Sequence, residues 1–240
     1  MNHMKALAVA GMLLSTHAHA QSAGSSIISL GWLRVMPNSS SDPLFIDSIG
    51  GVPVNQSVPN TGARIKDADT VGLAFTHFIT DNLAVELAGG VPPRHKITGA
   101  NAFAPYGEIG SAKQWSPAML FKWYFGGAES RFRPYVGAGL NYTWFGDEKI
   151  TNSALQTQVL GSGFPNASSV STDSSINPVL NVGASYAVTK DWFVSLSMSY
   201  LPLKTTAKID TTLASGAHAI TEAKIRINPI VAFLSIGYGF

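Results

Sequence analysis

The sequence predicts an all-β fold, an eight-stranded antiparallel up-and-down transmembrane β-barrel, and three observations support this. Large apolar residues recur at every second position in eight stretches, which is the period of a β-strand. The opposite phase of these stretches carries mostly Gly, Ser, Thr and Asn. Long and short connections alternate between the stretches, the pattern of a membrane barrel with loops at one end and turns at the other.

The composition agrees with a surface that meets lipid. Of the 240 residues, 12% are charged and 45% are hydrophobic, whereas an average soluble domain is about 25% charged. No apolar run reaches the roughly 18 residues of a membrane helix, so spanning a membrane would require a closed barrel. A net charge of +2, without a basic run interleaved with aromatics, argues against a nucleic-acid partner. The chain has no Cys, which excludes Cys-based metal sites and thiol catalysis, and we predict no metal and no cofactor.

The first 20 residues have the pattern of a signal peptide. Lys5 precedes an apolar run from Ala6 to Leu14, and Ala18-His19-Ala20 matches an A-x-A cleavage site. The run is too short to anchor the chain in a membrane. We therefore expect residues 1–20 to direct export and residues 21–240 to form the barrel.

The first four strands follow from their alternation. They are expected at 26–36, 70–79, 83–91 and 116–125. The first strand is the least regular, because Leu33 and Val35 join its phase of small residues. The turn Thr80-Asp81-Asn82 joins the second strand to the third, since Asp and Asn tolerate positive φ and bond their own backbone.

The last four strands are expected at 135–144, 180–188, 194–200 and 230–240. Short turns at 126–131 and 189–191 separate the fourth strand from the fifth and the sixth from the seventh. Pro134, Pro178 and Pro229 lie near strand beginnings, where a missing N–H is tolerated.

The four remaining connections are long and are expected as irregular loops. They lie at about 37–69, 92–113, 146–175 and 210–221 and are rich in Gly, Pro, Ser, Thr and Asn. A short helix within Ser153 to Leu160 is weakly indicated. The plan predicts the outer membrane of a Gram-negative bacterium, with the long loops outside and both termini in the periplasm.

The C-terminus carries a further indication. Tyr238 and Phe240 continue the large-residue phase to the end of the chain, where the last residues of a soluble protein usually fray. Aromatic residues suit the girdle of a membrane barrel. A terminal Phe after alternating apolar residues also resembles the signal read by the barrel-assembly machinery, which is therefore an expected partner. The final strand of a soluble β-sandwich is the alternative for this stretch taken alone.

Several short motifs carry a family resemblance. They are Thr80-Asp81-Asn82 with Val85-Glu86-Leu87, Arg94-His95-Lys96-Ile97, Trp123-Tyr124-Phe125-Gly126, Phe132-Arg133-Pro134-Tyr135-Val136-Gly137-Ala138-Gly139 with Asn141-Tyr142, Asp191-Trp192, and Tyr238-Gly239-Phe240. Together they resemble the outer-membrane protein W (OmpW) family, most specifically from Thr70 to Tyr142. Pro202-Leu203-Lys204-Thr205 is similar to the alkane-uptake AlkL branch. The resemblance implies an eight-stranded barrel associated with passage of small hydrophobic compounds across the outer membrane. The first and third loops match the family poorly, so the resemblance implies no particular ligand.

If the small-residue phase faces inward, the lumen has two halves. Toward the long loops we predict an apolar ligand channel formed by Leu33, Val35, Ala88, Leu120, Val179, Leu201, Leu203, Val231 and Phe233. Toward the short turns we predict a polar floor that includes Glu86, Lys122, Tyr124 and Tyr135. Glu86 and Lys122 lie on neighbouring strands and are candidates for an ion pair, because buried charges need partners. The alternative is that the apolar residues only pack the barrel core.

These features predict a channel for uptake of small hydrophobic molecules and not an enzyme. Lateral release into the membrane is expected beside Pro117 and Pro178, each of which removes a backbone donor. A structural or receptor barrel without transport is the first alternative. A barrel enzyme acting on lipid is the second, but no Ser and His can be placed within hydrogen-bond reach at the lipid interface. Outer-membrane lipids and lipopolysaccharide are further expected partners. Arg94, His95 and Lys96 are candidates to attract lipopolysaccharide, and a solvated basic loop is the alternative and more common explanation for them.

Overall fold

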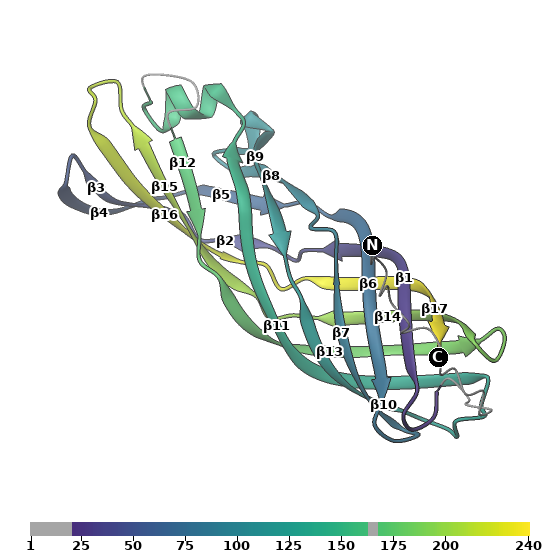
Figure 1. Cartoon of the computed structure of the whole chain (residues 1–240). Coiled ribbons are helices and arrows are strands. Elements are labelled where there is room, and N and C mark those ends of the chain that lie inside the picture. Colours follow the sequence, from purple (N-terminus) through teal and green to yellow (C-terminus); the bar gives the residue numbers. More distant parts are fainter. Residues whose placement is uncertain (1–20, 163–167) are drawn as a thin grey trace, which may run out of the picture.

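The computed structural model describes residues 21–162 and 168–240, and the predicted signal peptide lies outside them. The chain forms a closed barrel that continues at one end into long β-hairpins (Figure 1). The barrel strands are β1 (Ser26–Met36), β6 (Ala68–Phe78), β7 (Leu83–Gly90), β10 (Ala118–Tyr124), β11 (Phe132–Ile150), β13 (Ser175–Ala187), β14 (Trp192–Tyr200) and β17 (Ile230–Gly239).

Closure of the barrel follows from the strand pairing. β1 pairs antiparallel with both β6 and β17. The pairing with β17 runs from Ile27 opposite Gly239 to Met36 opposite Ile230. β10 pairs with β7 on one side and with β11 on the other, and the β10–β11 pairing closes the ring of strands. The ring order is therefore β1-β6-β7-β10-β11-β13-β14-β17, and the predicted eight-stranded antiparallel barrel is confirmed.

The prediction of irregular long loops is wrong, because these connections are mostly strands. They form β2 (Ser40–Ser41), β3 (Leu44–Ile49), β4 (Val52–Val58), β5 (Thr61–Ile65), β8 (Arg94–Asn101), β9 (Glu108–Trp115), β12 (Ser168–Thr172), β15 (Lys204–Thr212) and β16 (His218–Arg226). Some of the Gly and Asn residues that suggested loops take positive φ at turns or strand ends, as Gly50, Asn60 and Asn101 do, whereas others, such as Gly62 and Gly99, lie within strands. The helical turn expected within 153–160 is present as the π-helix η2 (Leu155–Val159).

Two sheets build this extension. β9, β8 and β5 continue the barrel sheet from the long strand β11, whereas β12, β15, β16, β3 and β4 form a second sheet, with β2 paired to β16. A 3-10 helix, η1 (Ala104–Tyr106), joins β8 to β9. We call this end of the barrel the hairpin end. The opposite end, with the short turns at 79–82, 125–131 and 188–191, is the turn end.

The outer surface of the barrel is apolar and exposed. Trp32, Leu73, Phe121 and Leu180 are 49%, 51%, 50% and 62% exposed, and they represent the large-residue phase of their strands. Aromatic side chains gather toward both ends. At the hairpin end they are Trp32, Trp115, Tyr142, Trp144 and Tyr200, and at the turn end Trp123, Phe125, Phe132, Tyr186, Trp192, Tyr238 and Phe240. An apolar belt between two aromatic girdles is typical of a lipid-facing barrel wall. Within the described residues, no helix is long and apolar enough to span a membrane.

Small residues in the inward phase make room for a few large ones. A Cβ at Gly72 would lie 2.6 Å from the Phe233 ring, and a Cβ at Gly183 would lie 2.6 Å from the Tyr135 ring. These glycines are therefore fixed by the packing of the lumen. The turn end is filled by the cluster Ile27, Phe78, Ala84, Tyr124, Tyr135 and Phe193.

Candidate functional site

A cavity of about 380 Å³ occupies the half of the lumen nearer the hairpin end. Eight of the nine residues predicted for the apolar channel line it, namely Leu33, Val35, Ala88, Leu120, Val179, Leu201, Val231 and Phe233. All eight barrel strands contribute lining residues, because one phase of every strand faces the lumen. The passage of a ligand through this cavity remains a prediction.

Leu203 departs from the prediction. Its side chain is fully buried and does not line the lumen cavity. β14 ends at Tyr200, and the chain then turns away from the barrel into β15. The Leu203 carbonyl accepts the backbone N–H of Ile227 at 2.8 Å, which fixes Leu203 in the junction between the barrel and the β15–β16 hairpin.

The base of this cavity is an ion pair. Lys122 Nζ lies 2.5 Å from Glu86 Oε2, and the Thr76 hydroxyl donates to the same oxygen at 2.9 Å. The ammonium group also lies 4.5 Å from the centre of the Tyr135 ring. Both charges are buried, so each depends on the other for stabilisation. Glu86 lines both the large cavity and a void of about 20 Å³ on its turn-end side, and Lys122, Tyr124 and Tyr135 line only the void.

Arg133 seals the turn end, a role that was not predicted from the sequence. Its side chain is fully buried, and it donates Nη1 to the Gln21 carbonyl at 2.7 Å and Nη2 to the Asp81 carbonyl at 2.5 Å. The guanidinium lies 5.3 Å from the Tyr124 ring centre and 5.7 Å from that of Phe78. The only sequence signal was an arginine in the inward phase. Its acceptors are backbone carbonyls, which no residue pattern reveals.

A second cavity, of about 140 Å³, lies inside the hairpin end. Its wall is apolar and comes from both sheets and from η2, with Leu44, Ile97, Phe103, Ile109 and Leu155 among the lining residues. No sequence pattern indicated it, because the wall is assembled from the connections that were expected to be irregular.

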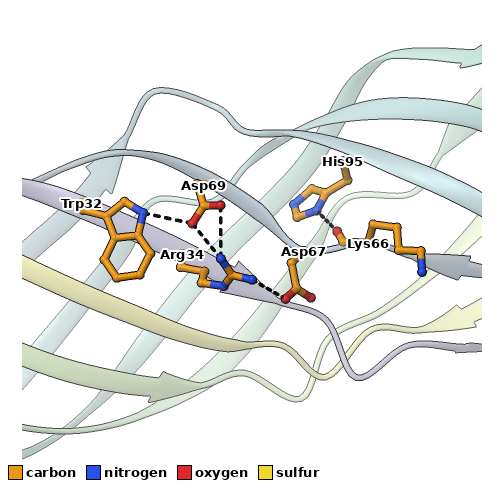
Figure 2. Close-up of polar contacts among 6 residues, drawn as sticks. All are labelled: Trp32, Arg34, Lys66, Asp67, Asp69 and His95. Atoms are coloured by element: carbon orange, nitrogen blue, oxygen red, sulfur yellow. Dashed lines mark hydrogen bonds and ion pairs between the residues drawn. The ribbon is translucent and has the colours of Figure 1, made fainter.

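His95 faces this inner region and not the outside. It is 2% exposed, and its Nδ1 lies 2.9 Å from the Lys66 carbonyl (Figure 2). Burial lowers the pKa of His95, against the opposing effect of the Lys66 carbonyl. The expectation that His95 meets lipopolysaccharide is therefore wrong, whereas its neighbours Arg94 and Lys96 are exposed.

The wall of the lumen has a window where β7 and β10 separate. Their pairing ends at Ala88 opposite Ala118, and the next contact is the bond from Gln114 N to Pro93 O at 3.0 Å. Between these points, 89–92 faces 115–117, and these segments also line the lumen cavity. Pro92, Pro93 and Pro117 have no N–H to donate across the space.

Each edge of the window is held from its other side. Val91 N donates to Val71 O at 2.9 Å, and the Thr70 hydroxyl donates to Val91 O at 2.7 Å. On the opposite edge, Tyr142 N donates to Pro117 O at 3.0 Å. The window is thus a fixed feature of the ladder. Pro178, which was expected to open a similar gap, lies within the continuous pairing of β11 with β13, opposite Leu140, and two residues beyond the last pair of β13 with β14, Leu180 opposite Tyr200.

The expectation that no Ser and His lie within hydrogen-bond reach at the lipid interface is wrong, because Ser26 and His77 meet at the turn end. Ser26 Oγ lies 3.0 Å from His77 Nδ1, and the two residues are cross-strand partners on the lipid-facing phase. Within the described ranges, no carboxylate contacts the His77 ring, so the group that would orient a catalytic base is missing. The same residues contain no group of three or more His, Asp or Glu that could hold a metal ion.

Known proteins similar to the chain share this plan. The OmpW family model matches residues 22–240. Outer membrane protein W of Escherichia coli is 34% identical over 241 residues, which cover 99% of this chain and all of that protein. The crystal structure of the outer membrane protein OprG from Pseudomonas aeruginosa superposes with a TM-score of 0.78 at 27% identity, covering 93% of this chain and 98% of OprG.

Two more distant relatives have other names. The dibenzothiophene metabolism operon protein PahQ of Pseudomonas aeruginosa is 32% identical over 187 residues, 77% of this chain and 78% of PahQ. Outer membrane protein AlkL of Ectopseudomonas oleovorans is 28% identical over 184 residues, 77% of this chain and 71% of AlkL. Full-length matches and a shared barrel lead to one conclusion: the chain belongs to the OmpW family of bacterial outer-membrane β-barrel proteins.

Proposed function

We propose that this barrel takes up small hydrophobic molecules, which enter at the hairpin end and leave sideways through the window into the membrane. The observation that carries the proposal is a mainly apolar lumen cavity that is closed toward the turn end and is lined on one side by segments where the pairing of β7 with β10 is interrupted. The name of the relative PahQ refers to dibenzothiophene, a small apolar aromatic compound, and this supports the substrate class.

The energetics favour the sideways route. A hydrophobic molecule in the lumen cavity gains about 25 cal/mol for each Å² of apolar surface that it buries. Movement toward the turn end would bring it against the Glu86–Lys122 pair and then against the hydrogen bonds of Arg133. These groups would lose partners without gaining any from an apolar ligand. The window leads instead to the apolar belt, where Trp115 stacks on Trp144 with ring centres 5.7 Å apart.

The route requires a defined orientation in the membrane. We place the hairpin end outside the cell and both termini in the periplasm, with outer-membrane lipids around the belt. In this arrangement Tyr238 and Phe240 lie at the periplasmic girdle, where the barrel-assembly machinery would read them as its signal. Single cysteines at Lys190 and Ser215 test it in intact cells with an impermeant thiol reagent. We expect labelling at 215 alone, and labelling at 190 alone would reverse the orientation.

A substitution that fills the window tests the route. Gly89 stands at the outer mouth of the window: its backbone lines the cavity, it is the cross-strand partner of the lipid-facing Leu73, and a Cβ added there would have no atom within 4 Å. Gly89→Phe is therefore expected to fold normally and to reduce uptake of naphthalene by at least about 10-fold, by occupying the exit. Gly127→Phe is the matched control, because Gly127 also has open space around it and lies in a turn at the opposite end.

The alternative is a structural or receptor barrel without transport. It predicts that cells with and without the protein take up naphthalene equally. A third result, in which the wild type transports and folded Gly89→Phe transports equally well, would retain uptake and exclude the window as the exit.

A further inference from the structure

A row of basic side chains crosses the outer face of β5, β8 and β9 at the hairpin end. We call it the basic strip, and its members are Arg64, Lys66, Arg94, Lys96 and Lys113. The inward residues between them, such as His95 and Ile97, line the hairpin-end cavity. Alternation along the strands therefore directs the basic groups outward.

The basic strip lies just beyond the apolar belt. Lys113 is two residues from Trp115, which pairs with Trp144 in the aromatic girdle. At about 3.4 Å per residue, the first basic groups stand roughly 7 Å farther along the strand than the tryptophans. Aromatic girdles mark the membrane interface, so the strip begins at the level of the lipid headgroups.

At two places in the strip, two positively charged residues on neighbouring segments face each other. Arg94 is the direct cross-strand partner of Lys113. Lys66 is beside Lys96, since Lys66 N donates to Lys96 O at 2.9 Å. Directly opposed like charges destabilise a sheet. An anion between each pair would remove this cost.

The first pair already contains such an anion. Asp147 Oδ2 lies 2.7 Å from Arg94 Nη2 and 2.8 Å from Lys113 Nζ. The Lys113 ammonium, and then the Arg94 guanidinium, lower the pKa of Asp147. This face of the hairpins thus holds one negative group between two strands.

The second pair has no equivalent group. Lys96 Nζ reaches Glu108 at 3.0 Å, but among the described residues no carboxylate lies within ion-pair distance of Lys66 or Arg64. Asp67 is turned instead to Arg34, at 2.9 Å, and the Lys66 ammonium group extends away from both (Figure 2). Five basic groups in the strip face two carboxylates, a surplus of three positive charges.

We propose that the basic strip binds a phosphate-bearing lipid of the surrounding leaflet. One phosphate of this lipid would lie between Lys66 and Lys96, in the same way that the Asp147 carboxylate lies between Arg94 and Lys113. Phosphate suits this position because its oxygens accept charge-assisted hydrogen bonds from two cations at once. The headgroup level is where such phosphates are concentrated. Arg94 directly follows Pro93 at the window, so the bound headgroup would stand beside the exit from the lumen.

Binding of diphosphoryl lipid A to the purified chain in neutral-detergent micelles tests this. Lys66→Gln with Lys96→Gln should weaken binding by roughly 10- to 30-fold, since each cation near a lipid surface contributes about 1 kcal/mol. The matched control is Lys204→Gln with Lys224→Gln, two exposed lysines on β15 and β16 outside the strip. This control should change binding less than twofold. Asp147→Asn should strengthen binding, because it opens the first pair to a second phosphate.

Four results would overturn the proposal. They are equal binding of dephosphorylated lipid A, equal losses in the two double variants, displacement of the lipid by inorganic phosphate at the lipid's own concentration, and no gain from Asp147→Asn. Because no transported compound enters the assay, failure here leaves the uptake proposal untouched. Conversely, a barrel that transports nothing can still bind the lipid.

Discussion

The two halves of the lumen are built by the same eight strands but differ in how their interiors are filled. The half near the hairpin end contains a 380 Å³ cavity with a mainly apolar wall. The half near the turn end is packed by Phe78, Tyr124 and Tyr135 and closed by the hydrogen bonds of Arg133. Protein interiors normally leave few voids larger than a water molecule. The half near the hairpin end, which we call the empty half, therefore lacks packing contacts that the half near the turn end has. We therefore expect stability to reside mainly in the turn half, whereas the proposed ligand passage would use the other half.

The most damaging substitution should be Arg133→Met, which keeps the side-chain length and removes the charge. The carbonyls of Gln21 and Asp81 would lose their buried donor, and each orphaned group costs about 1–3 kcal/mol. We expect a loss of about 3–5 kcal/mol in the free energy of unfolding, measured by urea titration of tryptophan fluorescence in lipid vesicles. Phe233→Leu, in the wall of the cavity, should cost only about 1 kcal/mol. Equal costs at the two positions would contradict the division of roles.

The Glu86–Lys122 pair marks the boundary between the halves. Lys122→Met leaves Glu86 buried without its partner, and breaking a buried pair typically costs about 3–5 kcal/mol. Glu86→Gln together with Lys122→Met leaves no uncompensated charge and should cost less than either single change. The same urea titration, run as a double-mutant cycle, measures the coupling. Additive costs would show that the two charges act independently.

The barrel itself could be predicted from the sequence because its signals are local. Alternation places Val35 and Phe233 inside, and the same inward phase on neighbouring strands brings Glu86 to Lys122. The window could be predicted only in part: the sequence indicated the edge at Pro117, but the extent of the window depends on where the β7–β10 register ends and on the β9 strand that begins within an expected loop. Arg133 was missed for a related reason, because its partners are the main-chain carbonyls of distant segments.

The hairpin end shows the same limit more strongly. β5 pairs with β8 from Thr61 opposite Asn101 to Ile65 opposite Ile97, across a gap of dozens of residues. Neither strand alternates clearly enough to be recognised alone. The cavity, the buried position of His95 and the basic strip all follow from this long-range pairing.

Uptake should depend on the empty half. Phe233→Asp places a carboxylate in the wall of the lumen cavity, where it would hold water and make burial of an apolar molecule less favourable. We expect naphthalene uptake to fall by at least about 10-fold, equivalent to about 1.4 kcal/mol. Gly127→Asp adds the same charge outside both cavities and should leave uptake unchanged. Folding of each variant is checked by its heat-dependent mobility on a denaturing gel. Full uptake by folded Phe233→Asp would reduce the apolar wall to core packing.

The smallest effect should be a pH dependence confined to the hairpin end. Lys113 and Arg94 lower the pKa of Asp147 in the folded protein. A carboxyl group with a lowered folded pKa contributes stability above its unfolded pKa, near 3.8, and loses it as the pH falls through the folded value. The pair is exposed and screened by solvent, so the loss should affect only local opening of β8 and β9.

Hydrogen exchange of Lys96 and Ala112 amides should become faster, relative to opening-independent controls, below about pH 4. Asp147→Asn should remove this change, and amides around Arg133, whose partners are uncharged carbonyls, should not show it. An equal pH response in the turn half would mean that the two ends do not open separately.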